Sequence, residues 1–184
     1  MKLFAFLLLA LPAQASADAF VDNWFSRCAL EADRQVQAAT RRASPVGRIT
    51  LSYCAAQAIN ICRFSDTPLA CVDSSFAQFE ATIETRLARL PDDVEGDLVP
   101  VMRYNRRIAS LKSGETELER IAASEQLSSA KKNAMTEQYL RNVEQKRPLW
   151  IPSDTFVKLW ELIVAVSEIH TLESLYRRSS GVKR

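Results

Sequence analysis

The sequence is poor in the residues on which many enzymes depend. Only 4 of the 184 residues are glycine, and His170 is the only histidine. So little glycine argues against a glycine-rich loop that holds phosphate groups. No serine lies in a Gly-x-Ser-x-Gly motif, and nucleophilic catalysis needs a base beside the nucleophile. The sequence therefore predicts no catalytic residues, and we expect a protein that is not an enzyme.

The chain also lacks a strong net charge. Its formal charge is +2, which becomes +1 if a leader carrying Lys2 is removed. The basic clusters have acidic neighbours and are interpreted as solvated faces; they are Arg41-Arg42, Arg103/Arg106/Arg107, Lys131-Lys132 and Arg177-Arg178. A near-neutral chain creates no long-range field toward nucleic acid or anionic membranes. We therefore expect no nucleic-acid partner.

An export signal is predicted for residues 1–17. One lysine precedes the apolar run from Leu3 to Leu11, and Ala15-Ser16-Ala17 supplies the small residues of a cleavage site before Asp18. The run is shorter than the roughly 20 residues that span a bilayer. Residues 18–184 are then one secreted, periplasmic domain, with no membrane span.

The four cysteines are Cys28, Cys54, Cys62 and Cys71. An even number behind an export signal predicts two disulfides. If Cys54 and Cys62 share a helix they lie about 12 Å apart, too far to be bonded. Two pairings remain: Cys28–Cys54 with Cys62–Cys71, which we favour because Cys62 and Cys71 flank a turn, or Cys28–Cys62 with Cys54–Cys71. The gaps are wider than those of zinc ligands, so no metal or other cofactor is expected.

The rest of the pattern predicts an all-α fold, a single disulfide-stapled bundle of five to six helices. Glycine is scarce, Ala, Leu, Glu, Arg and Gln are abundant, and apolar residues recur at steps of three and four. The expected helices are residues 19–42, 46–64, 67–90, 98–112, 116–143 and 153–178.

Several boundaries are open. Residues 46–53 alternate like a strand, although no partner strand is evident, and the polar stretch 124–133 is either a protruding helix or a break between two helices. Thr67 with Pro68, and Thr116 with Glu119, are helix-start signals. In the third and fourth helices the residues expected to face inward are Leu69, Val72, Phe76, Phe79, Ile83, Leu87, Leu90, Leu98, Met102, Ile108 and Leu111.

Two segments are candidate binding sites. Ser113, Gly114 and Glu115 lie between two predicted helices, where Gly114 suits a helix C-cap. Trp150 lies between Pro148 and Pro152 and is either a strap onto the core, which we favour, or an exposed aromatic anchor for a partner. His170, at the edge of the apolar face of the last helix, is expected to be a packed residue.

The segment from Cys54 to Pro91, CAAQAINICRFSDTPLACVDSSFAQFEATIETRLARLP, resembles the LprI-type lysozyme inhibitors, which are small exported helical proteins. Cys54, Cys62 and Cys71 and the apolar run from Phe76 to Leu90 carry the resemblance, over about a fifth of the chain. The family's later tryptophan, Tyr-Arg pair and closing cysteine are missing.

The resemblance implies a periplasmic protein that binds a protein partner, a lysozyme, and inhibits it by occlusion. The turn Ser113–Glu115 would then offer its acid to a basic enzyme. The alternatives are a periplasmic hydrolase, whose acids the sequence cannot assemble, and a structural envelope protein without catalytic activity.

Overall fold

The computed structural model describes residues 16–42, 49–95 and 99–181, and within these ranges it contains seven helices and no strand. The helices are α1 (Ser16–Arg42), α2 (Leu51–Cys62), α3 (Pro68–Leu87), α4 (Val99–Lys112), α5 (Glu117–Ala123), α6 (Ser129–Glu144) and α7 (Ser153–Gly181). The predicted all-α class is confirmed. Residues 1–15, which hold most of the predicted export signal, lie outside the described ranges.

The expected number of helices was too low because the polar stretch after residue 123 is a break. Thr116 and Glu119 form the predicted capping box, in which the Thr116 side chain accepts from the backbone N–H of Glu119 and the Glu119 side chain accepts from that of Thr116. Helix α5 ends at Ala123, and Ser128 caps the start of α6. Few apolar residues are available to bury here, and most helical stability in proteins comes from packing of an apolar face, so this stretch gains little from remaining helical.

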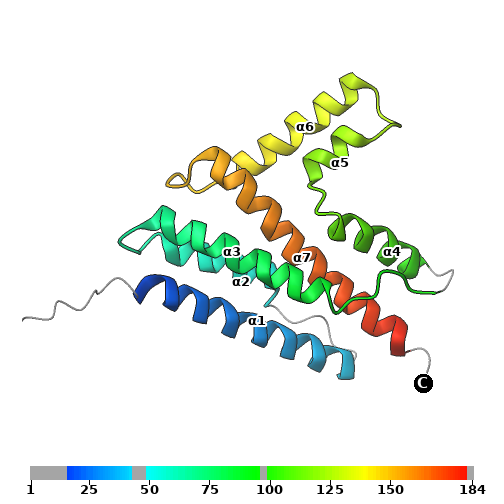
Figure 1. The fold of residues 1–184 in the computed structure, drawn as a ribbon, viewed down its shortest axis with the longest axis horizontal. Coiled ribbons are helices and arrows are strands. Elements are labelled where there is room, and N and C mark those ends of the chain that lie inside the picture. The colour runs from blue at the N-terminus through cyan, green and yellow to red at the C-terminus, as the bar shows by residue number, and fades with distance from the viewer. Residues whose placement is uncertain (1–15, 43–48, 96–98, 182–184) are drawn as a thin grey trace, which may run out of the picture.

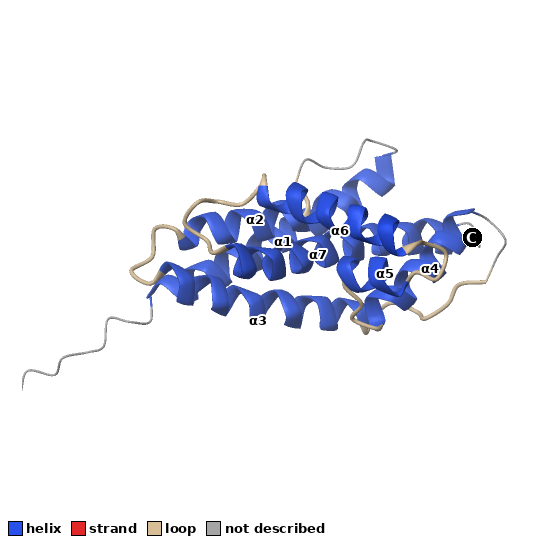
Figure 2. Ribbon diagram, turned by 90° about the horizontal axis from the view of Figure 1, so that it is seen from above, coloured by secondary structure: helices blue, strands red, loops and turns tan. Residues whose placement is uncertain are grey.

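Helix α7 is the central element. It packs against α2, α3, α4 and α6, and it runs between α1–α3 on one side and α4–α6 on the other (Figure 1). The segment 162–166 is apolar all round, which suits a helix with neighbours on several sides. Seen from above, α3 lies along one long edge of the bundle, and only helices and loops are present in the described chain (Figure 2).

Two clusters of buried side chains form the core. The larger joins α1, α2, α3 and the first half of α7, and includes Phe25, Leu51, Phe79 and Leu159. The smaller joins the end of α3, α4 and the second half of α7, and includes Tyr104 and Ile169. Ile83 packs against both clusters, so the core is continuous along α3. None of the described helices has the length and apolar character that a membrane crossing requires.

Two disulfides tie the first three helices together, in the favoured pairing. The α1–α2 disulfide joins Cys28 to Cys54, and the α2–α3 disulfide joins Cys62 to Cys71, with Cα–Cα distances of 5.7 and 5.5 Å. Each bond crosses from one helix to the next, so α2 is held on both sides.

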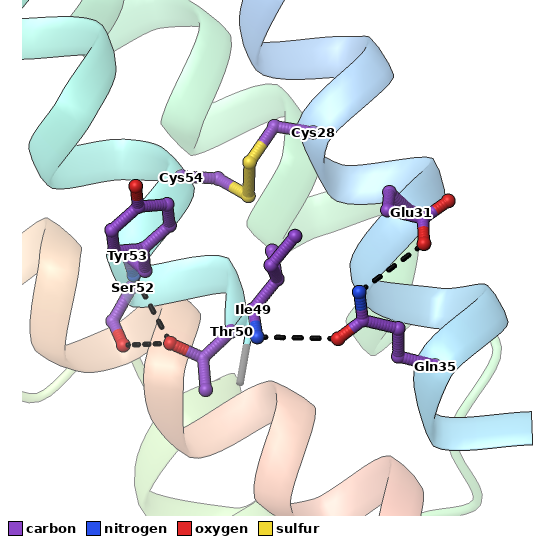
Figure 3. Close-up of a disulfide and its surroundings, with 8 residues drawn as sticks. All are labelled: Cys28, Glu31, Gln35, Ile49, Thr50, Ser52, Tyr53 and Cys54. Carbon is purple, nitrogen blue, oxygen red and sulfur yellow. Dashed lines mark hydrogen bonds between the residues drawn. A yellow bond between two sulfur atoms is a disulfide. The ribbon is translucent and has the colours of Figure 1, made fainter. Parts of the chain in front are cut away.

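Hydrogen bonds fix the entry to α2 beside the α1–α2 disulfide (Figure 3). The Ile49 backbone N–H donates to Gln35 on α1, and the Gln35 amide donates to Glu31. The Thr50 hydroxyl accepts from the backbone N–H of Tyr53 and caps the helix. The open choice for residues 46–53 is therefore settled as helix from Leu51 onward, while residues 46–48 lie outside the described ranges.

Two residues expected to face inward do not. Met102 is 53% exposed and Leu69 is 46% exposed. The buried face of α4 is formed by Val101, Tyr104 and Ile108, at steps of three and four, and Met102 lies about 100° around the helix from Val101. Leu98 lies outside the described ranges. Leu69 lies in the first turn of α3, at the end of the bundle.

Other boundaries also differ from the prediction. Helix α3 ends at Leu87, before Pro91, and Thr67 precedes it without a side-chain capping bond.

Trp150 is partly buried against the larger core cluster, which agrees with the favoured strap. Its neighbour Leu149 is 95% exposed.

Candidate functional site

The predicted binding turn lies at the mouth of a cavity between helices. Gly114 follows α4 with φ +70°, the left-handed conformation that glycine adopts without strain, as the C-cap prediction requires. Gly114 and Glu115 both line the cavity. Ser113 is exposed beside it and donates its hydroxyl to the Ser110 carbonyl, 2.7 Å away. The turn thus closes one side of a concave surface.

The cavity has a volume of about 340 Å³ and lies among α3, α4, the α4–α5 turn, α5 and α7. Its apolar floor contains Ile83, Leu111, Leu162 and Ala165. Charged side chains line the remainder; the acids are Glu80, Glu84, Glu115, Glu117, Glu161 and Glu168, and the bases are Arg107 and Arg120. We call this site the acidic cavity.

Both arginines of the acidic cavity are already paired. Arg107 lies 2.9 Å from Glu168, and the Arg120 Nε donates to Glu117 at 2.9 Å. The other four carboxylates, Glu80, Glu84, Glu115 and Glu161, form no ion pair within the described ranges. The cavity therefore carries an excess of negative charge and is complementary to a cation.

Glu161 is held in place at the inner wall. It accepts a hydrogen bond from the Tyr139 hydroxyl at 2.7 Å and one from the Glu117 backbone N–H at 3.3 Å. Burial, the hydrogen bond to Glu161 and the nearby acidic charges raise the pKa of Tyr139 far above its usual value. Tyr139 therefore remains a hydrogen-bond donor, and Glu161 is fixed before any ligand arrives.

Of the two predicted binding segments, the structure places only the turn at the acidic cavity. Trp150 lies in the α6–α7 connection and packs on the larger core cluster. The sequence prediction missed the helical acids, although their spacing is a usable signal: Glu80 and Glu84 are four residues apart on α3, and Glu161 and Glu168 are seven apart on α7. Such spacings place each pair on one face of its helix.

A second charged cluster joins α1, α3 and α7. Asp33, His170 and Glu173 offer ligand atoms within 4.8 Å of one another, close enough to be considered as a candidate metal site. The Arg86 guanidinium already lies between the two carboxylates, donating to Asp33 at 2.8 and 3.1 Å and to Glu173 at 2.8 Å. Arg86 thus offsets one of the two negative charges, and we interpret the cluster as a structural ion network. His170, only 8% exposed, is packed as expected.

The cysteines supply no nucleophile, because each of the four is in a disulfide.

Comparison with known proteins gives no relative. No family model, no curated protein and no solved structure matches the chain. The function must therefore be argued from the acidic cavity itself. Its fixed Glu161, its unpaired carboxylates and its apolar floor suit the binding of a cationic group that also carries an alkyl part.

Proposed function

We propose that the protein is an exported binding protein of the bacterial envelope that takes a cationic side chain of a protein partner into the acidic cavity. A basic lysozyme, inhibited by occlusion, is the special case to which the resemblance to LprI-type inhibitors points. The observation that carries the proposal is a set of four carboxylates around an apolar floor that form no ion pair within the described residues.

The size of the cavity supports a side chain as the ligand. About 340 Å³ is at the lower end of the roughly 300–1,000 Å³ typical of ligand sites. A lysine or arginine side chain has the matching form, since its alkyl stem can contact Ile83 and Leu162 while its charged head reaches the carboxylates.

The location of the acids supports a protein partner. Glu80 and Glu84 are exposed on α3, and the Gly114–Glu115 turn forms the opposite rim. A partner surface can therefore reach both rims while one cationic side chain enters between them. Opposite charges on the partner would raise its association rate and make binding sensitive to salt.

Support for export comes from the two disulfides and from the apolar run from Leu3 to Leu11. Structural disulfides persist in oxidising compartments such as the bacterial periplasm. A chain that carries a leader and two such bonds fits that compartment.

The test uses the mature protein from Asp18 with two probes, a basic lysozyme and a short lysine-rich peptide. Lysis of bacterial cell walls is measured with the lysozyme, and binding of both probes is measured by calorimetry at low and high salt. We expect saturable, salt-sensitive binding that weakens at least tenfold, about 1.4 kcal/mol, in the double variant Glu80→Gln/Glu84→Gln.

A matched control is Glu125→Gln/Glu137→Gln, which changes the net charge equally at exposed sites outside the acidic cavity. This control should bind as the wild type does. Unchanged lysis at excess protein removes the lysozyme case. Failure of both probes to bind, or equal weakening in both double variants, rejects a cation site in the cavity.

A further inference from the structure

A second, oppositely charged groove lies on the other side of the Arg107–Glu168 ion pair. It follows the contact between α4 and α7 and has a volume of about 900 Å³. Its lining consists of Met102, Arg103, Arg106, Arg107, Glu168, Thr171, Leu172 and Leu175. We call it the arginine groove. From the sequence, these arginines were expected to be offset by acidic neighbours. Among the described residues this is the case for Arg107, which pairs with Glu168.

Two of the three arginines form no ion pair within the part of the chain that the structure describes. Arg107 pairs with Glu168 at 2.9 Å, whereas Arg103 and Arg106 make no ion pair or hydrogen bond with any residue in the described ranges. They lie three residues apart, so both guanidinium groups extend from one face of α4. A guanidinium offers a planar pair of donors that matches a carboxylate or phosphate.

The groove also has an apolar strip. Met102 is 53% exposed, and it lines the groove together with Leu172 and Leu175 from α7. Leu172 is only 2% exposed and so forms the base of the strip. The arginines and the strip together favour a ligand with an anionic head and an apolar body.

We propose that the arginine groove binds a free single-chain anionic amphiphile of the fatty-acid class. The head is held by Arg103 and Arg106, and the alkyl chain lies along Met102, Leu172 and Leu175. An acidic amphipathic helix is a poorer fit, because groove-bound helices use a series of apolar anchors over two turns or more. Here the strip has three apolar side chains, and its two members on α7, Leu172 and Leu175, lie about 4.5 Å apart along the helix axis, which is less than one turn.

The test is calorimetric titration of the mature protein with decanoate below its micelle concentration. Two probes separate the parts of the ligand: decyl maltoside keeps the chain and removes the charge, and acetate keeps the head and removes the chain. We expect decanoate to bind saturably and both other probes to bind at least tenfold more weakly. Equal binding of decyl maltoside, or no binding of decanoate, would overturn the proposal.

Variants locate the site. Arg103→Gln/Arg106→Gln should weaken decanoate binding at least tenfold, and Arg141→Gln, an exposed arginine on α6 outside the groove, should leave it unchanged. Thr171→Trp, which fills the groove from α7 and retains all the arginines, should also abolish binding. Circular dichroism checks that each variant is folded. Unchanged affinity in either groove variant would show that decanoate binds elsewhere.

A vesicle assay separates a free amphiphile from a membrane surface. Vesicles rich in phosphatidylglycerol present anionic heads whose chains are not accessible. We expect the protein to bind free decanoate and not to sediment with such vesicles. Sedimentation without decanoate binding would replace our proposal with a membrane-surface role. Since the probe is anionic, this result is independent of the cationic probes used for the acidic cavity.

Discussion

The ion network around Arg86 predicts a large loss of stability when its cation is removed. Arg86 on α3 is 12% exposed and holds Asp33 of α1 and Glu173 of α7, which are 26% and 14% exposed. Burial acts to lower the pKa of Arg86, but its hydrogen bonds to Asp33 and the charges of both acids raise it above its usual value. Arg86 is therefore charged at any pH at which the protein is folded.

The substitution Arg86→Met keeps most of the side-chain volume and leaves two carboxylates without a cation. Loss of one partner from a buried ion pair costs about 3–5 kcal/mol. Asp33 is partly accessible, so water replaces some of its lost hydrogen bonds, and we expect about 3 kcal/mol. For a chain of this length that corresponds to a fall in Tm of about 6–12 °C.

The assay is urea unfolding of the mature protein, followed by far-ultraviolet circular dichroism. The triple variant Arg86→Met/Asp33→Asn/Glu173→Gln removes the charges of the acids as well, and it should recover at least half of the lost free energy of unfolding. A single variant within about 1 kcal/mol of the wild type, or a triple variant no more stable than the single, would refute a buried network.

Three other perturbations have expected outcomes. Replacing both cysteines of the α1–α2 disulfide by alanine should lower the free energy of unfolding by about 1 kcal/mol more than replacing those of the α2–α3 disulfide. The reason is loop length, since the α1–α2 disulfide closes a loop of 26 residues and the α2–α3 disulfide one of 9. Paired urea titrations measure the difference. Hydrogen bonds from Thr116 lower the pKa of Glu119 below 4.5, so the ionised Glu119 stabilises the folded protein above that pH and this contribution is lost as the pH falls. The difference in urea midpoint between the wild type and Glu119→Gln should therefore vanish in acid. Burial, then the charges of Tyr176 and Asp92, raises the pKa of Tyr104 to about 12, so the unfolded chain releases this proton first, near pH 10. Stability should therefore fall between pH 10 and 12, and it should fall less steeply in Tyr104→Phe, which keeps the contribution of Tyr139. At neutral pH Tyr104→Phe should cost about 1 kcal/mol in urea unfolding, for the lost bond to the Pro91 carbonyl.

Local signals were read correctly from the sequence. Gly114 and the pair Thr116 and Glu119 were predicted because a helix end is decided by a few neighbouring residues. The disulfide pairing was accessible in part: the rise of a helix excludes a bond between Cys54 and Cys62 and leaves two pairings, of which the turn between Cys62 and Cys71 favoured the one observed. These predictions depend on distances of one or two helical turns.

Predictions that depend on packing between distant segments were incomplete. Both Met102 and Tyr104 are apolar enough to face inward, and their exposure was decided by how α4 lies on α7. The Arg86 network joins residues 53 and 87 positions apart, which no local pattern connects. The acidic cavity likewise draws its carboxylates from three helices and a turn, so its charge emerged only when α3, α4, α5 and α7 were placed together.

The Arg107–Glu168 pair explains how two sites of opposite sign can be neighbours. Both residues line the acidic cavity and both line the arginine groove, so the pair forms a shared wall. At 2.9 Å the two charges offset each other, and neither site has its excess charge reduced by this wall. On the cavity side the excess comes from acids on α3, α7 and the α4–α5 turn, and on the groove side it comes from Arg103 and Arg106. A near-zero net charge over the whole chain is therefore compatible with one locally negative site and one locally positive site. Composition alone is a poor guide to what this surface binds.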